Sequence, residues 1–343
     1  MNSKKDLGTT SVSSFELPCS ALLDDESAKV FERSAVYAKE LAEKLSEGPL
    51  PMDLRGASPD QLPVIRQSIR DMVLSSAGYV RLTKKFKTAM NIETMGGVYT
   101  EVFTPIEGVA KKNRERVLIN LHGGSFMGGE RSGSHLESIP ISAVGKIKVV
   151  SIDYRMAPEY QFPAASDDVL SVYKYLLKDY QPQNIGIYGS SAGALLTAQS
   201  LARFQEELLP LPAAAGMLAA AGYYWMEGDS GCIGSAINGI PIDSFGLDND
   251  LYFKGVDENN ALAFPSRHSE VLANFPPSLL VSSTRDFALS SVVKTHSQLT
   301  KLGVKADLHI WEGLGHVFYF DSELPESLEL YDVLVNFFEK HLG

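Results

Sequence analysis

The sequence predicts an α/β fold in which a mostly parallel sheet carries helices on both faces. Apolar runs of strand length alternate with helical patterns along most of the chain, and this alternation is typical of parallel βαβ units. A Gly-x-Ser-x-Gly pentapeptide at a strand-to-helix junction and a glycine-rich loop after an earlier strand fit that layout. The apolar runs span residues 117–121, 147–152, 185–188, 213–221, 279–282 and 308–311.

Length and composition fit a globular protein. The 343 residues suffice for two average domains or for one large α/β domain with insertions. Apolar residues make up 44% and charged residues 21%, and no apolar stretch approaches the length of a membrane span. The formal net charge of -11, without a lysine or arginine cluster, argues against binding to nucleic acid.

The N-terminal residues and the cysteines suggest a cellular location and redox state. Residues 1–18 are polar and lack the apolar core of a signal peptide, which predicts a cytoplasmic protein unless an export signal has been trimmed away. Cys19 and Cys232 match neither a metal-ligand spacing nor a disulfide framework, so we expect two free thiols. No metal or other cofactor is predicted.

Two helices are predicted before the first strand. Residues 25–47 place apolar side chains three or four positions apart, which is typical of one helical face. A second helix begins at Ser58, which can form a capping box with Gln61, and runs to about Ser76. Residues 98–104 then alternate in the period of a strand.

The pentapeptide Gly189 to Gly193 predicts a nucleophilic serine. It follows the apolar run 184–188 and precedes the helical pattern 194–204. A serine at such a junction sits on a sharp, strained turn, so its neighbours must be small, as Ser190 and Ala192 are. Ser191 is therefore the candidate nucleophile.

The loop from His122 to Phe126 predicts donors for a developing negative charge. It follows the apolar run 116–121, and its glycines let backbone N–H groups approach a ligand closely. Acyl transfer needs such donors, because its tetrahedral intermediate carries an oxyanion. The N–H of Ala192, next to the nucleophile, is the other expected donor. A plain glycine-rich turn is the alternative, and the pairing with Ser191 disfavours it.

A serine nucleophile needs a base and an acid that orients the base. His316 follows the predicted strand 308–311, so a loop presents it at the same sheet edge as Ser191, whereas His309 lies within that strand. Asp286 follows the strand 279–282 and precedes His316. The resulting chain order of serine, aspartate and histidine is the one expected of α/β-hydrolases.

From about Val98 to its C-terminus the chain resembles the hormone-sensitive-lipase-like (bacterial family IV) carboxylesterases, which have the α/β-hydrolase fold. The resemblance rests on residues 122–126, 154–159, 162–165, 189–193, 286 and 315–316. It implies Ser191 as nucleophile, His316 as base and Asp286 as its orienter. It further implies an oxyanion hole made by Gly123, Gly124, Ser125 and Ala192, and an eight-stranded sheet with a helical cap.

The cap implied by the resemblance consists of residues 1–87 and of an insertion at residues 227–263, where the strand and helix rhythm breaks off. Residues 88–226 and 264–343 would form the catalytic domain. Two positions depart from the family pattern. Ser125 stands where a third glycine is usual, and Ser190 stands where an aspartate is usual, which removes a nearby charge.

The predicted reaction is hydrolysis of small or short-acyl esters through an acyl-enzyme, without a cofactor. We expect an apolar pocket lined by residues at strand ends and in the cap, namely Phe126, Ser190, Tyr223, Trp225, Phe287 and Phe318. An amidase or peptidase with the same machinery stays an alternative. So does a non-catalytic ligand-binding relative, although that class typically lacks the histidine that is present here as His316. Relatives often pair through an edge strand or C-terminal helix, so a homodimer is a further open expectation.

Overall fold

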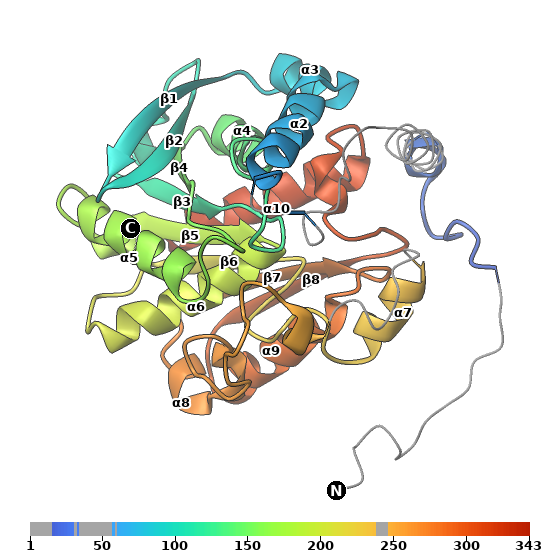
Figure 1. The fold of residues 1–343 in the computed structure, drawn as a ribbon. Helices are drawn as coiled ribbons and strands as arrows, with labels where there is room; N and C mark the ends of the chain where they lie inside the picture. Colours follow the sequence, from blue (N-terminus) through green and yellow to red (C-terminus); the bar gives the residue numbers. More distant parts are fainter. Residues whose placement is uncertain (1–15, 31–32, 34–56, 59, 238–245) are drawn as a thin grey trace, which may run out of the picture.

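The computed structural model describes residues 16–30, 33, 57–58, 60–237 and 246–343. Most of the helix predicted at residues 25–47 lies outside the described residues, although residues 25–30 are helical. Residues 16–30 lie beside the C-terminal part of the chain (Figure 1), where Ser20 Oγ donates to Glu312 Oε1 at 2.9 Å. No helix among the described residues is long and apolar enough to cross a membrane.

The predicted eight-stranded, mostly parallel sheet is confirmed, with the strand order β1-β2-β4-β3-β5-β6-β7-β8. β2 pairs antiparallel with both of its neighbours, β1 and β4, and all other pairs of neighbouring strands are parallel. The strands are β1 (Thr88–Met95), β2 (Val98–Pro105), β3 (Val117–Leu121), β4 (Lys148–Ile152), β5 (Ile185–Ser190), β6 (Ala214–Leu218), β7 (Ser278–Ser283) and β8 (Ala306–Trp311).

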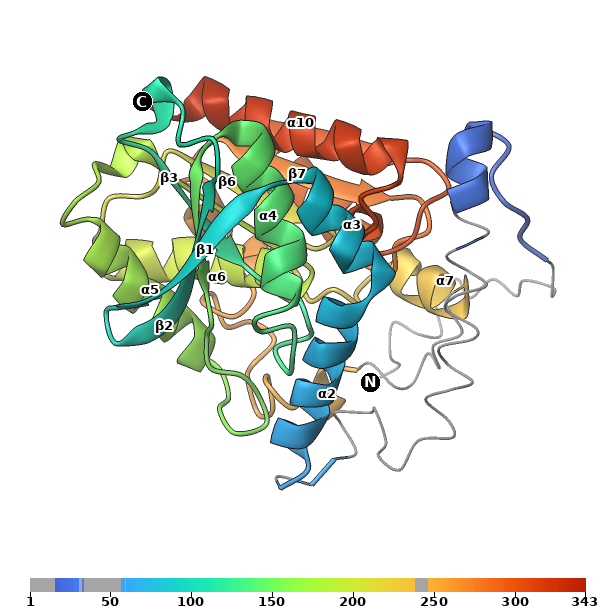
Figure 2. The ribbon, with the colours of Figure 1, turned by 90° about the horizontal axis from the view of Figure 1, so that it is seen from above.

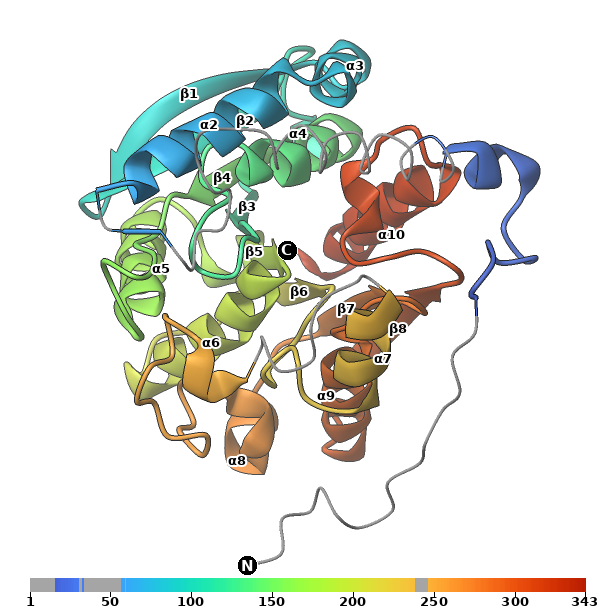
Figure 3. The same ribbon diagram turned by 45° about the vertical axis from the view of Figure 1, so that its right-hand side comes forward.

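Helices cover both faces of the sheet. Figure 3 shows α4 and α10 on one side and α5, α6 and α9 on the other. The helices are α2 (Leu62–Ser75), α3 (Ala77–Lys85), α4 (Gly133–Gly145), α5 (Ala164–Leu176), α6 (Ala192–Glu206), α7 (Asp229–Ile237), α8 (Ser269–Leu272), α9 (Leu289–Lys301) and α10 (Pro325–His341).

The hydrophobic core has two layers because successive strand residues face opposite sides of the sheet. In β3, Ile119 belongs to the cluster beneath α5 and α6, whereas its neighbour Leu118 belongs to the cluster beneath α4 and α10. The predicted run 213–221 is longer than β6, which ends at Leu218, because Ala219 has a left-handed φ of 57°. Such a residue cannot continue a strand.

The helix predicted from Ser58 to about Ser76 corresponds to α2, and a second helix, α3, which the sequence did not predict, follows it directly. α2 begins at Leu62. Just before it, Gln61 Oε1 accepts a hydrogen bond from Ser58 N–H at 3.0 Å. The extended Ser76 separates α2 from α3, and its Oγ caps α3 by accepting from Tyr79 N–H. Figure 2 shows α3 beside α4. The division into a cap of residues 1–87 and 227–263 and a catalytic remainder stays a prediction, and residues 238–245 lie outside the described part.

Candidate active site

Ser191 occupies a tight turn between β5 and α6. Its φ of 55° and ψ of -120° are strained for a residue with a side chain, and its N–H donates to Leu218 O at 2.8 Å. A Cβ atom at Gly189 would lie 2.3 Å from Gly193 O, and one at Gly193 would lie 1.8 Å from Leu121 O. Only glycine fits at these two positions, because any side chain there would collide with a backbone carbonyl oxygen.

The structure brings Ser191, His316 and Asp286 together. The distance from His316 Nε2 to Ser191 Oγ is 2.8 Å, and that from His316 Nδ1 to Asp286 Oδ1 is 2.7 Å. Asp286 is 1% exposed, and its carboxylate also accepts from Ser282 Oγ at 2.9 Å and Ala288 N–H at 2.8 Å. These added bonds fix the carboxylate toward the imidazole.

The loop after β8 is anchored so that His316 faces Ser191. Ser283 Oγ, at the end of β7, donates to Gly315 O at 2.9 Å. On the other side, the ring of Phe287 stacks on the imidazole of His316 with centroids 4.1 Å apart. The position of the ring is thus set by Ser283 at the end of β7 and by Phe287 in the loop that follows β7.

The loop after β3 is held in a left-handed conformation at Gly124, Ser125 and Phe126, whose φ values are 117°, 54° and 56°. A Cβ atom at Gly124 would lie 2.0 Å from Gly128 O, so only glycine fits there. Among the residues that the structure describes, the N–H groups of Gly124 and Ser125 have no acceptor. Ala192 begins α6, so its N–H has no acceptor within the helix either.

Gly123 requires a correction, because it was predicted as an oxyanion donor. Its N–H donates to Oε1 of Glu137 in α4 at 2.9 Å, so this donor is already engaged. Glu137 also accepts from Asn120 Nδ2 at 2.8 Å, and the Ser190 side chain is a further partner. Burial raises the pKa of Glu137 to about 8, although these hydrogen bonds partly offset the effect. Ser190 stands where the family usually has an aspartate, and the buried carboxyl of Glu137 lies beside it.

Most of the residues predicted to line the substrate pocket pack elsewhere. Phe126 is fully buried and stacks on Tyr252, with centroids 4.1 Å apart. Trp225 is 4% exposed in the same aromatic cluster, and Tyr223 donates through its hydroxyl to Gln298 Oε1. Phe318 packs against Trp311 in the opposite core layer. Ser190 is buried beneath the turn, and of the six residues Phe287 is the one whose ring stacks on a triad side chain, that of His316.

A cavity of about 290 Å³ opens beside the loop after β3. Its walls are mainly apolar and come from α2, from the loop and the start of α4, and from Phe320. The sequence did not predict this pocket, although the apolar Ile69 and Val73, four residues apart in α2, are a signal that could have found it. It is lined by Arg66, Ile69, Val73, Gly123, Gly124, Gly128, Gly129, Glu130, Ser132, Gly133, Leu136 and Phe320.

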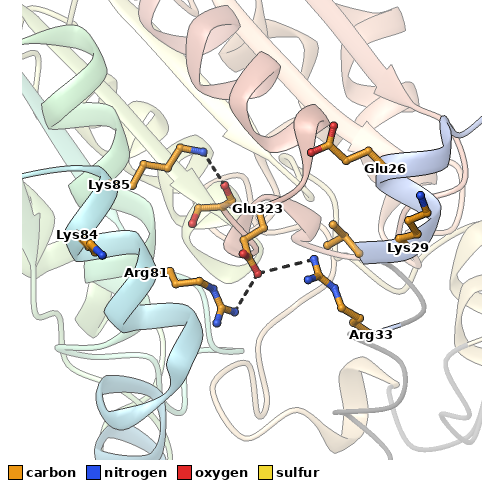
Figure 4. Close-up of a pocket in the computed structure, with 9 residues that line it drawn as sticks. Glu26, Lys29, Arg33, Arg81, Lys84, Lys85 and Glu323 are labelled. Carbon is orange, nitrogen blue, oxygen red and sulfur yellow. Dashed lines mark hydrogen bonds and ion pairs between the residues drawn. The ribbon is translucent and has the colours of Figure 1, made fainter.

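A larger hollow of about 910 Å³ lies between the N-terminal segment, α3 and the chain before α10. Figure 4 shows Arg33 and Arg81 directed toward Glu323 in this hollow, with Lys85 directed toward the backbone of Ser322. None of its lining residues belongs to the triad or to the loop after β3. The smaller cavity is not lined by a triad residue either, but Gly123 and Gly124 line it, and a Cβ atom at Gly123 would lie 3.3 Å from Ser191 Cβ. The smaller cavity is therefore the candidate substrate site.

A family model described as alpha/beta hydrolase fold matches residues 118–320. The chain belongs to this family. The matched span contains Ser191, Asp286 and His316, and it begins just before the loop after β3.

Named relatives of the chain include esterases and an acetyl-hydrolase. An acetyl-hydrolase of Streptomyces hygroscopicus is 30% identical over 233 residues, which cover 66% of this chain and 77% of the relative. A versiconal hemiacetal acetate esterase of Dothistroma septosporum is 25% identical over 226 residues, or 62% of this chain and 69% of the relative.

Solved structures of esterases have the same fold as this chain. The crystal structure of esterase E25 superposes with a TM-score of 0.82 at 29% identity, covering 98% of this chain and 99% of that one. An esterase from the bacterial hormone-sensitive lipase family shares the fold, with a TM-score of 0.70 at 24% identity over 84% of this chain and 100% of that one. The predicted membership among hormone-sensitive-lipase-like carboxylesterases, a class of carboxylic ester hydrolases, is confirmed.

Proposed function

We propose that this chain hydrolyses small or short-acyl carboxylic esters with Ser191 as nucleophile, His316 as general base and acid, and Asp286 as the group that orients His316. The observation that carries the proposal is the continuous relay of 2.8 Å and 2.7 Å contacts from Ser191 Oγ through the imidazole to Asp286. A buried carboxylate at Nδ1 keeps the proton on that nitrogen and leaves Nε2 free to accept one.

In the proposed reaction, Ser191 Oγ attacks the ester carbonyl while its proton moves to His316 Nε2. The N–H groups of Gly124, Ser125 and Ala192 donate to the resulting oxyanion. Collapse of the intermediate breaks the bond to the alcohol oxygen, which takes the proton from Nε2. Water then gives a proton to the imidazole and attacks the acyl-enzyme, and the proton returns to Ser191 as the acid leaves.

The size and lining of the cavity support a small acyl group. About 290 Å³ lies at the lower end of the range for small-molecule sites. Ile69, Val73 and Leu136 supply apolar walls next to Gly124, where an acyl chain would extend from the carbonyl. We further propose that residues 1–87 and 227–263 act as the cap. A cytoplasmic location and a homodimer stay predictions.

Covalent labelling tests this function. A fluorophosphonate followed by peptide mapping should label Ser191, and Ser191→Ala should lose both the label and the hydrolysis of nitrophenyl acetate. Ser297→Ala, which changes an exposed serine of α9, is the matched control and should keep both. A label on another residue, or an active Ser191→Ala variant, would refute the proposal. Matched ester and amide substrates separate an esterase from an amidase, because an amine leaving group needs better protonation by His316.

A further inference from the structure

We propose that Glu137 is a positioning residue that holds the oxyanion loop behind Ser191, and that it does so as a neutral carboxylic acid. This inference rests on the proposed function, since it concerns the donors that would bind the oxyanion. Glu137 belongs to none of the motifs that predict the site, because it lies inside α4.

The Glu137 carboxyl joins three structural elements beneath the nucleophile. Oε1 accepts from Gly123 N–H in the loop at 2.9 Å, and Oε2 accepts from Asn120 Nδ2 in β3 at 2.8 Å. The third partner is the side chain of Ser190 at the end of β5. Because Gly123 directly precedes Gly124 and Ser125, the bond to its N–H fixes the start of the segment that would supply two oxyanion donors.

The distances place this carboxyl close to the reacting centre. A Cβ atom built on Gly123 would lie 3.3 Å from Ser191 Cβ and 3.7 Å from Glu137 Oε1. A single backbone unit thus separates the carboxyl from the nucleophile. A negative charge on Glu137 would repel the oxyanion through a water-poor interior, where charge interactions are strong.

The surroundings of Glu137 favour its protonated form. It is 4% exposed, and among the described residues no lysine or arginine bonds to it. The titratable groups that face it are the phenols of Tyr154, Tyr188 and Tyr319. Tyr154 follows β4, Tyr188 lies in β5, and Tyr319 lies in the turn after His316. Burial, and then Glu137, raise the pKa of each phenol, so all three are neutral at the pH of the reaction.

Ser190 explains how a proton can be accommodated. The N–H groups of Gly123 and Asn120 can only donate, so a protonated Glu137 needs an acceptor for its own hydrogen, and a serine hydroxyl can accept or donate. An aspartate at position 190 would instead place two carboxyls side by side. The family that the chain resembles usually has its carboxyl at position 190. Here the carboxyl next to Ser190 is that of Glu137, and burial raises its pKa to about 8.

Glu137→Gln is the informative substitution, because an amide keeps an acceptor for Gly123 N–H and cannot ionise. Its NH₂ group would face Asn120, which can rotate its amide by half a turn. Ser151, which donates to Asn120 Oδ1 at 2.7 Å, can reverse its hydroxyl to suit that rotation. Glu137→Ala removes the acceptor altogether.

The experiment is a profile of kcat/KM for nitrophenyl butyrate between pH 6 and 10. Wild-type activity should fall above about pH 8, whereas Glu137→Gln should keep activity within about threefold at pH 7 and lose that alkaline fall. Glu137→Ala should lower kcat at least about tenfold with little change in KM, because the oxyanion donors lose their position. Glu93→Gln, an exposed residue of β1, is the matched control and should follow the wild type.

Two results would overturn the inference: an unchanged alkaline fall in Glu137→Gln, or a loss at pH 7 in Glu137→Gln as large as that in Glu137→Ala. Thermal melting checks that each variant is folded, and the Gln variant keeps the test valid if the Ala variant is not. Fluorophosphonate mapping of each variant separates this failure from failure of the proposed function. If only the role of Glu137 is wrong, the label stays on Ser191.

Discussion

Arg66 of α2 donates through Nε to Met127 O, in the loop after β3, over 2.7 Å. The same guanidinium donates to Ala157 O at 2.6 Å and pairs with both carboxylate oxygens of Glu159. One side chain thus ties the helix above the cavity to the loop and to residues 154–159. That segment, which carries part of the family resemblance, anchors α2 here.

Arg66→Ala should lower kcat/KM about ten- to hundredfold, since small displacements of catalytic groups cost that much. Arg66→Lys should recover only part of the loss, because an ammonium group cannot form the paired bonds to Glu159. Arg70→Ala on the same helix is the control, as Arg70 bonds to Gln67 within α2. Steady-state kinetics on nitrophenyl acetate measure the effect, and equal losses in Arg66→Ala and Arg70→Ala would contradict it.

Asp286→Asn should lower kcat on the order of 10⁴-fold with little change in stability, because the amide favours the wrong imidazole tautomer. Burst kinetics with nitrophenyl acetate would show the loss in the acylation step. The exposed Asp307→Asn in β8 should leave the rate unchanged. A loss of less than tenfold in Asp286→Asn would mean that another group orients His316.

Val73→Trp should shorten the range of acyl chains that the enzyme accepts, because the indole would fill part of the cavity beside Gly124. The ratio of kcat/KM for hexanoate to that for acetate should fall about tenfold, in line with the effect of steric exclusion in apolar pockets. Val64→Trp, on the exposed side of α2, should not change the ratio. An unchanged ratio in Val73→Trp would place the acyl group elsewhere.

Acid should destabilise the protein through Glu101 of β2. Burial raises the pKa of this carboxyl, but the hydrogen bonds from His135 and Ser134 and the charge of His135 lower it further, so the net shift is downward. The stabilising contribution is therefore complete above the ordinary pKa of about 4.5 and is lost as the pH falls through the lowered value.

Urea unfolding between pH 3 and 6 measures this contribution. The free energy of unfolding should decline below about pH 4.5 in the wild type and decline less in Glu101→Gln. Tyr79→Phe removes the hydroxyl that bonds to His135 Nδ1 at 2.8 Å, and it should weaken the attachment of α3 to α4 without changing the acid slope. Identical slopes in the wild type and Glu101→Gln would assign acid sensitivity to other groups.

The sequence predicted the central strands well because β3 to β7 are buried on both faces and read as continuous apolar runs. The carboxyl ends of β5, β7 and β8 meet at one sheet edge, and for that reason three residues far apart in the chain converge at the predicted site. The end of α2 near Ser76 was predicted, but α3 was not, since a serine at the end of one helical pattern does not by itself reveal that it caps a further helix.

Residues whose role depends on packing could not be read from the sequence. Glu137 looks like an ordinary helix residue until α4 is placed against Gly123 and Asn120. Likewise, Phe126 and Phe318 have the composition of pocket walls, but opposite sides of the sheet bury them. The cavity itself is formed between α2 and a loop more than 50 residues later, a separation that local patterns do not bridge.

The close backbone approaches around Ser191 also decide how the enzyme could be re-engineered. Saturation libraries at Gly189, Gly193 or Gly124 would consist almost wholly of misfolded members, since any side chain there collides with a carbonyl oxygen. Diversity introduced on α2, at positions such as Val73 and Ile69, reshapes the same cavity without touching those contacts. Substitutions on α2 can therefore alter selectivity while the backbone contacts around Ser191 stay unchanged.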